Sequence, residues 1–152
     1  MNYWIAVVSK NYVQMGIDEG ILHLCHGKEA PLKRIQQGDG IIYYSPTMMY
    51  NGKEKCQSFT GIGRVTGEHA YLHEMEPGVN AFRKDAEYYP AADVLIAPLI
   101  PSLSFITNKK NWGILFRSGL LKISYEDFKL IAQQMKLSSA LIDELKSNES
   151  KK

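Results

Sequence analysis

Histidines and cysteines are the residues of this sequence that could hold a metal ion. His23, Cys25 and His26 fall in one short segment, and His69 and His73 stand four positions apart further along the chain. A structural zinc site needs a complete set of four ligands at recognised spacings, and neither group offers one. The second pair also differs from the HExxH motif of zinc proteases. The sequence therefore predicts no metal site and no other cofactor.

Catalytic groups are equally sparse. Cys25 stands beside His26, but adjacent residues rarely face one another, and no orienting third group or oxyanion hole is recognisable. Residues 60–64 contain a GxG step without the third glycine or the following lysine of a phosphate-binding loop. These observations favour a protein that is not an enzyme.

Aromatic residues gather at the ends of predicted strands and in loops. Each one alone is better explained as a core residue, because a buried ring removes a large apolar area from water. As a set they could supply the flat walls of a binding pocket. They are Tyr12, Tyr43, Tyr44, Tyr50, Phe82, Tyr88, Tyr89 and Trp112.

The elements that would position these residues begin with a strand at residues 3–8. Its aromatic and β-branched residues occupy both alternating sides, which predicts a central strand covered on both faces. A helix of about two turns is predicted from Asn11 to Gly20, and a shorter helical turn at 28–35. Strands follow at 41–44 and at 58–65, where glycines indicate a bulge or a close backbone approach. Edge strands and loops are expected at residues 88–89, 92–96 and 105–106.

The C-terminal region is strongly helical. Ser124 and Asp127 resemble a capping box, and four apolar residues follow at helical spacing on one face: Phe128, Ile131, Ala132 and Met135. A last helix is predicted to begin at Ser138 or Ser139. The whole pattern indicates an α+β fold in which a small, strongly bent sheet or open barrel is flanked by helices.

Length and composition fit one domain. The chain has 152 residues, 45% of them hydrophobic, and a formal net charge of only +2, so any contact with phosphates must come from a local patch. Cys25 and Cys56 form no CxxC pair, which favours free thiols in a reducing compartment. We found no signal-peptide pattern and no run of roughly 20 apolar residues, so a cytoplasmic location is expected, with no membrane association.

Five motifs, in order along the chain, resemble those of the EVE-domain family. They are Tyr3–Ser9, Cys25–Lys28, Gly38–Pro46, Gly61–Val65 and Trp112–Gly119. The resemblance implies a PUA-like fold, which is a bent mixed β-barrel flanked by short helices and a C-terminal helix. Residues 1–137 would form this domain, and 138–152 a C-terminal helical extension with a polar tail. The family is similar to the YTH readers of methylated adenine and is associated with modified bases, notably modified cytosines in DNA.

By position, the resemblance implies a pocket for one base, with aromatic walls and polar groups for the edge of the base. It also implies that residues 81–89 form an aromatic loop that contributes to this pocket. The residues implied in this pocket are Ser9, Asn11, Tyr12, His23, Tyr44, Ser45, Phe82 and Tyr88. The expected phosphate contacts are Lys10, Lys28, Arg34, Arg83, Lys84 and Arg117.

The function expected from these residues is a module that captures a modified or flipped base of DNA or RNA without catalysis. Two alternatives stay open. One is a small enzyme that acts on a nucleobase or nucleoside through Cys25 or His26, and the other is a protein whose pocket takes a small ligand unrelated to nucleic acid. An uncharged pocket mouth would favour the small ligand.

Overall fold

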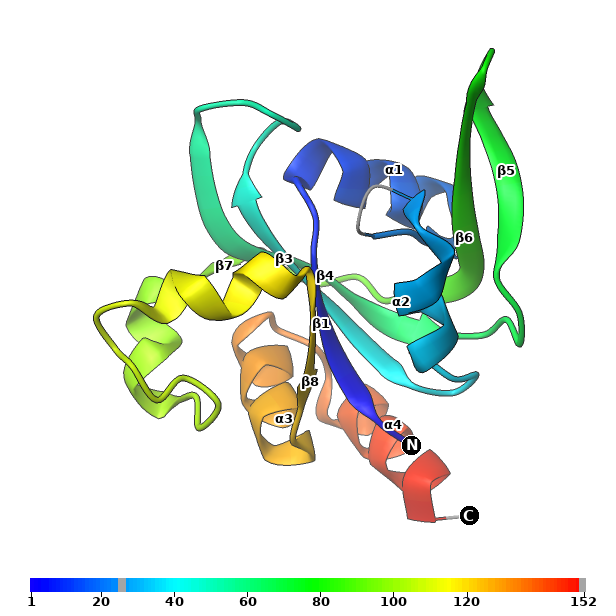
Figure 1. Ribbon diagram of the computed structural model, residues 1–152. Coiled ribbons are helices and arrows are strands. Elements are labelled where there is room, and N and C mark those ends of the chain that lie inside the picture. Colours follow the sequence, from blue (N-terminus) through cyan, green and yellow to red (C-terminus); the bar gives the residue numbers. More distant parts are fainter. Residues whose placement is uncertain (25–26, 151–152) are drawn as a thin grey trace.

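The computed structural model describes residues 1–24 and 27–150, with side chains as far as Lys146. A curled mixed sheet runs through the molecule, and helices pack on both of its sides (Figure 1). The strands are β1 (Tyr3–Val7), β2 (Ile21–Leu22), β3 (Gly40–Thr47), β4 (Lys55–Val65), β5 (Tyr71–Glu76), β6 (Val79–Tyr88), β7 (Val94–Leu95) and β8 (Leu120–Ile123). The α-helices are α1 (Lys10–Glu19), α2 (Glu29–Arg34), α3 (Tyr125–Gln134) and α4 (Ser139–Ser150), and two 3₁₀ helices are η2 (Ala97–Ser102) and η3 (Trp112–Ser118).

The sheet has the strand order β2-β6-β4-β3-β1-β8, with β5 paired to β6 and β7 paired to β4. Strands β1 and β3 run parallel, with Val7 opposite Tyr44, whereas the other pairings are antiparallel. The end of β1 therefore lies between β3 and the segment that leads into β8. The predicted α+β class with a bent, partly closed sheet is confirmed.

Two glycines in β4 permit the tight curvature. A side chain on Gly63 would place its Cβ 2.1 Å from the carbonyl oxygen of Glu87, and one on Gly61 would meet the rings and methyl groups of α1 and β3. The β3–β4 register also shifts between Tyr43 and Tyr44. Both features match the bulge and the close backbone approach that the glycines predicted.

Strand β1 is covered on both faces, as its sequence predicted. Ile5 belongs to an apolar cluster that includes Phe128 of α3, and Trp4 belongs to a second cluster that includes Val13 of α1. The indole N–H of Trp4 donates to the Asp39 carboxylate at 2.9 Å. Because alternate residues of a strand point to opposite faces, β1 anchors both halves of the core.

The helical ends also follow the sequence. Gly20 takes the left-handed conformation after α1, with a φ of 70°, and the Ser124 side chain accepts a hydrogen bond from the Asp127 N–H at the start of α3. Ile142 and Leu145 of α4 are buried in the core, so this helix packs on the domain. In the described part of the chain, we found no helix with the length and apolar character needed to cross a membrane.

One prediction about the middle of the chain is wrong. Residues 81–89 were expected to form an aromatic loop, but they belong mainly to β6, which pairs with β5 in a projecting hairpin (Figure 1). Pro77 and Gly78 make the turn, and Gly78 has the positive φ of 81° that such a turn favours. Strand β8, after Gly119, was also not predicted.

Candidate functional site

The main cavity lies beside the C-terminal end of β1 and has a volume of about 590 Å³. Five segments surround it: the end of β1 with the start of α1, the residues after β2, the β3–β4 loop, the β5–β6 hairpin, and the η3–β8 connection. Its lining residues are Val7, Val8, Ser9, Tyr12, His23, Leu24, Gly27, Lys28, Tyr50, Met75, Val79, Asn80, Ala81, Phe116, Arg117, Ser118 and Gly119. This volume falls within the roughly 300–1,000 Å³ typical of small-molecule sites.

Backbone pairing brings these segments together. The Val7 N–H donates to the Gly119 carbonyl at 2.9 Å, and the Val8 N–H donates to the Tyr44 carbonyl at 3.0 Å. Strand β2 pairs with β6, which places His23 next to the hairpin. Gly27 packs so closely on Ala81 that a Cβ there would lie 2.5 Å from the Ala81 Cβ.

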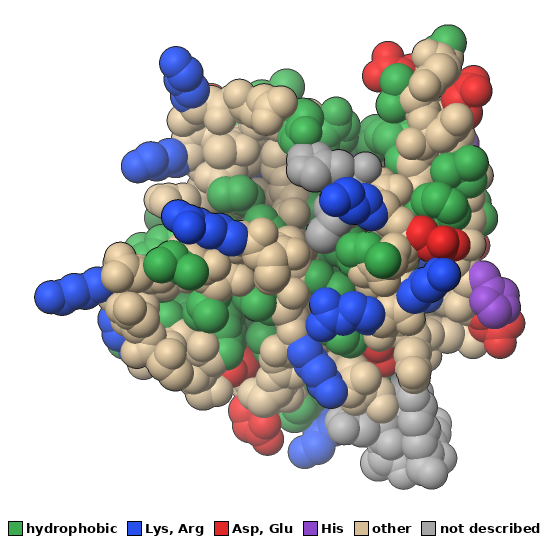
Figure 2. All heavy atoms as spheres, in the orientation of Figure 1, with side chains coloured by type: hydrophobic (Ala, Val, Ile, Leu, Met, Phe, Trp, Pro, Cys, Tyr) green, Lys and Arg blue, Asp and Glu red, His purple; other side chains and the backbone are tan. Residues whose placement is uncertain are grey.

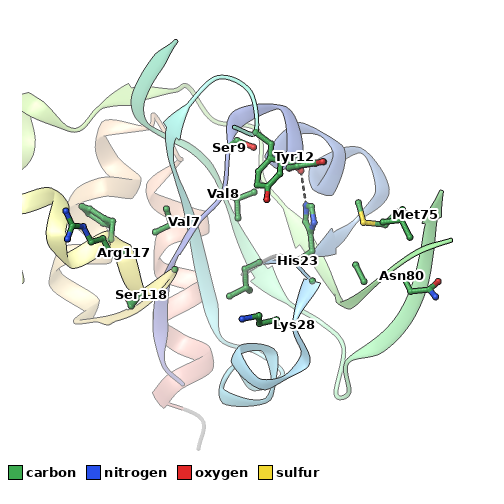
Figure 3. A pocket seen from close by; sticks show the side chains of 17 residues that line it. Val7, Val8, Ser9, Tyr12, His23, Lys28, Met75, Asn80, Arg117 and Ser118 are labelled. Carbon is green, nitrogen blue, oxygen red and sulfur yellow. Dashed lines mark hydrogen bonds between the residues drawn. The ribbon is translucent and has the colours of Figure 1, made fainter. Parts of the chain in front are cut away.

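Tyr12 and His23 form the centre of the cavity wall (Figure 3). Their rings meet edge to face with centroids 5.9 Å apart, and the His23 Nε2 lies 3.0 Å from the Tyr12 carbonyl oxygen. Because a carbonyl oxygen can only accept, Nε2 carries the proton. In the neutral ring, Nδ1 is then a hydrogen-bond acceptor.

The environment keeps the His23 imidazole neutral. Burial lowers its pKa from the ordinary value of 6.5, and the nearby Arg83 guanidinium lowers the pKa further. The Tyr12 carbonyl and the Glu19 carboxylate oppose these effects. The site therefore offers a ring of fixed orientation and fixed tautomer near neutral pH.

Tyr50 comes from the β3–β4 loop and adds a second aromatic ring, with its centroid 5.5 Å from that of Tyr12. Asn11 holds this loop against α1. Its Oδ1 accepts from the Tyr50 N–H at 3.1 Å and from the Ser9 hydroxyl at 2.8 Å, and its N–H donates to the Met48 carbonyl. Asn11 thus positions two lining residues without lining the cavity itself.

Two cationic side chains line the cavity, Lys28 from the segment before α2 and Arg117 from η3. Figure 3 shows them on different sides of it. The described lining residues include no Asp or Glu. The cavity is therefore suited to an anionic or electron-rich ligand.

Three of the predicted pocket residues, Ser9, Tyr12 and His23, share this cavity. The expectation that the other five share it is wrong, because strand alternation or local bonding directs them elsewhere. Apart from Asn11, these are Tyr44, Ser45, Phe82 and Tyr88.

Tyr44 faces the opposite side of β3 from Tyr43 and stacks on Phe116, with ring centroids 4.5 Å apart. It lines a second, smaller cavity of about 290 Å³ together with Trp112. Ser45 is fully buried, and its hydroxyl bonds the Thr60 hydroxyl across the β3–β4 pair at 2.7 Å.

Phe82 and Tyr88 belong to β6 and pack against the apolar cluster under α1 and α2. The Tyr88 ring stacks on Tyr43, its hydroxyl donates to the Ile21 carbonyl at 3.1 Å, and the two tyrosine hydroxyls are hydrogen-bonded to each other at 2.9 Å. Both residues therefore serve the core rather than the cavity.

Of the six predicted phosphate contacts, some line the cavity and others do not. Arg83 and Lys84 are buried. Arg83 pairs with Glu19, and Lys84 donates to the carbonyls of Leu32 and Ile35. The expectation that these two cations lie at the cavity mouth as phosphate contacts is therefore corrected.

Two more predicted phosphate contacts, Lys10 and Arg34, interact with other side chains close to the surface. Lys10 pairs with Asp93 at 2.7 Å, and the Arg34 guanidinium lies over the Trp4 ring at 5.3 Å. Lys28 and Arg117 are thus the predicted phosphate contacts that the fold brings to the cavity.

Several lining residues were not predicted as site residues, above all Met75, Val79, Asn80 and Ala81 of the hairpin. The Pro77-Gly78 turn between alternating strands was the available signal for them. Cys25 and His26, the candidate catalytic pair, lie outside the described residues. Within the described residues, no group of three or more His, Cys, Asp or Glu is placed to hold a metal ion.

Comparison with known proteins assigns this chain to a family. The EVE domain model matches residues 2–134. The chain belongs to the EVE domain family. A UPF0310 protein of Mesorhizobium japonicum is 45% identical over 135 residues, which cover 88% of this chain and 91% of that protein. The UPF0310 protein YdcG of Bacillus subtilis is 42% identical over 134 residues, covering 88% and 92% respectively.

Solved structures show the same EVE-like fold at low sequence identity. The crystal structure of Atu2648 from Agrobacterium tumefaciens superposes with a TM-score of 0.58 at 12% identity, covering 91% of this chain and 96% of that one. The NMR structure of Rpa0253 from Rhodopseudomonas palustris gives a TM-score of 0.55 at 15% identity, covering 90% and 94%.

Proposed function

We propose that this EVE domain binds nucleic acid and receives one extruded base, modified or unmodified, in the cavity beside Tyr12, without carrying out chemistry on it. The observation that carries the proposal is the combination in one cavity of an aromatic pair, a neutral histidine of fixed tautomer, and two cations. Each part meets one requirement of base binding.

The rings of Tyr12 and Tyr50 offer apolar surface for the face of a base. Base–aromatic stacking of this kind is worth roughly 1–3 kcal/mol. His23 Nδ1 can accept a hydrogen bond from an exocyclic amino group or a ring N–H, and such contacts at the base edge discriminate between bases.

Lys28 and Arg117 supply positive charge where the sugar and phosphates of an inserted nucleotide would enter. Figure 2 shows Lys and Arg side chains over the left and central parts of the face in view, whereas Asp and Glu lie mainly toward its right and lower margins. A charged cavity favours nucleic acid over the alternative of an uncharged small ligand. Phosphate contacts would add affinity that falls with salt.

Binding without catalysis is supported by the polar groups of the cavity. His23 is the described lining side chain best suited to act as a general base, and only its Nδ1 is open to that role, because Nε2 donates to the Tyr12 carbonyl. Neither an acidic partner nor a nucleophilic thiol stands among the described lining residues.

The test is a binding panel of matched oligonucleotides, single- and double-stranded, DNA and RNA, each carrying one modified base. We expect one modification to bind about tenfold or more tightly than its unmodified parent, the ratio that one good edge contact provides. Free nucleosides serve as a second set of ligands. Binding of nucleosides with no oligonucleotide binding at low salt would establish the small-ligand alternative, and turnover of any modified nucleoside would establish an enzyme.

A further inference from the structure

The β3–β4 loop beside the cavity presents an apolar side chain to solvent. Met49 has 57% of its surface exposed, and its neighbour Tyr50 is 45% exposed while lining the cavity. The loop projects from the sheet next to the start of α1 (Figure 1). An exposed apolar residue thus stands directly beside the site where a base would enter.

The loop is held in a defined shape by hydrogen bonds at its base. The Met48 N–H donates to the Glu54 carbonyl at 3.0 Å, and the Asn11 N–H donates to the Met48 carbonyl at 3.0 Å. These contacts fix both strands of the loop to each other and to α1.

The tip itself is closed under Met49. The Met49 carbonyl accepts from the Gly52 N–H and from the Thr47 hydroxyl, each at 2.9 Å. A Cβ at Gly52 would lie 3.1 Å from the Met49 Cβ, so glycine is what lets the turn close so tightly. The Met49 side chain is therefore carried on an ordered support, and little conformational entropy remains to be lost in the backbone when it binds.

Positive charge accompanies this apolar tip. Lys53 and Lys55 follow it in the chain, and both are exposed. Proteins that distort a duplex commonly insert an apolar side chain, methionine among them, between base steps while cations hold the phosphates on either side. The loop combines these two features next to the cavity.

We infer that Met49 is a wedge that enters double-stranded DNA and fills the space left by the base held in the cavity. This inference rests on the proposed function. It adds that the polymer is a duplex rather than an isolated strand. It also names the residue that stabilises the duplex at the point from which the base has been extruded. RNA duplexes fit less well, because recognition of individual RNA bases mostly uses single-stranded regions.

The probe is a DNA duplex with one mismatched base pair, which lowers the cost of extrusion, and 2-aminopurine next to the mismatch. The same strand without its complement is the matched ligand. For Met49→Ala we expect about tenfold weaker binding to the duplex, with single-strand binding unchanged. Only in the duplex does the extruded base leave a gap between base pairs that the Met49 side chain can fill. Fluorescence of 2-aminopurine should rise on binding of the wild-type protein and rise less with the variant.

Two further variants serve as controls. Met49→Leu keeps the apolar volume and should bind the duplex like the wild-type protein. Leu95→Ala removes a side chain that is 58% exposed on β7 and does not line the cavity, so it should change neither affinity. Equal duplex binding by Met49→Ala and the wild-type protein, or equal losses on duplex and single strand, would overturn the wedge. A wild-type protein that binds neither ligand would instead contradict the proposed base site itself.

Discussion

His23 Nε2 lies 3.0 Å from the carbonyl oxygen of Tyr12, which links the residue after β2 to the first turn of α1. The hydrogen bond sets the tautomer of the ring, and the edge-to-face contact with the Tyr12 side chain sets its orientation. An aromatic wall and an edge acceptor are therefore fixed relative to each other before any ligand enters. Such pre-organisation reduces the entropy lost on binding.

Removal of the Tyr12 ring should reduce selectivity. For Tyr12→Ala we expect about tenfold weaker binding to the preferred base, because stacking is lost, and a much smaller change for its unmodified parent. Tyr12→Phe keeps the ring and should bind like the wild-type protein. Fluorescence anisotropy with matched oligonucleotides measures both.

Phe82→Ala is the contrasting variant, because Phe82 packs on the core instead of lining the cavity. It should lower the melting temperature and leave the ratio of the two affinities unchanged. If Phe82→Ala abolished selectivity while Tyr12→Ala preserved it, the assignment of the wall would be wrong.

Removal of the cavity cations should act on all sequences alike. Arg117→Ala or Lys28→Ala is expected to weaken every oligonucleotide by a similar factor and to reduce the salt slope on duplex DNA by about 0.9 per lost phosphate contact. Affinity measured at several salt concentrations gives the slope.

Lys33→Ala is the matched control, since Lys33 is exposed, pairs with Glu29 and does not line the cavity. Its salt slope should equal that of the wild-type protein. A loss confined to one modified base in Arg117→Ala would show instead that Arg117 contacts the base.

The pH dependence of stability should report the burial of His23. Its pKa in the folded protein is lower than the ordinary 6.5, so as the pH falls through 6.5 the unfolded chain takes up a proton before the folded one does. The free energy of unfolding should therefore decrease with falling pH below about 6.5.

Urea unfolding at about pH 7.5 and about pH 5.5 measures this decrease in the wild-type protein and in His23→Gln. The variant lacks the titrating ring, so its decrease should be smaller. An equal decrease in both proteins would mean that other groups account for the acid destabilisation.

The sequence predicted the fold better than the site, for a physical reason. Period-two patterns and glycines report which positions must be buried or closely approached, so the burial of β1 on both faces and the tight packing at Gly63 were predictable. Position along the chain does not report which face of a strand a side chain occupies. Tyr44 and Tyr88 are therefore aromatic, as a pocket wall requires, but their side chains do not line the main cavity.

The convergence of distant segments was also beyond the reach of local patterns. Arg83 and Lys84 resemble surface cations in the sequence, yet β6 lies inside the sheet and directs Lys84 to two carbonyls at the end of α2. Tyr50 lines the cavity because Asn11, 39 positions earlier, holds its loop. Such long-range contacts depend on strand order, which periodicity alone does not give.

A methyl group at Gly63 would test the close approach that bends the sheet. In Gly63→Ala the new methyl group would lie 2.1 Å from the Glu87 carbonyl oxygen and 2.9 Å from the Tyr88 Cα, both of them backbone atoms that cannot rotate away. Strands β4 and β6 would have to separate, and we expect the free energy of unfolding to fall by about 2 kcal/mol or more. Gly113→Ala is the control, because nothing lies within 4 Å of a Cβ there, and its stability should stay within about 0.5 kcal/mol of the wild type. Urea denaturation of the three proteins measures these differences, and equal stability of the two variants would show that β4 and β6 are not in close contact at Gly63.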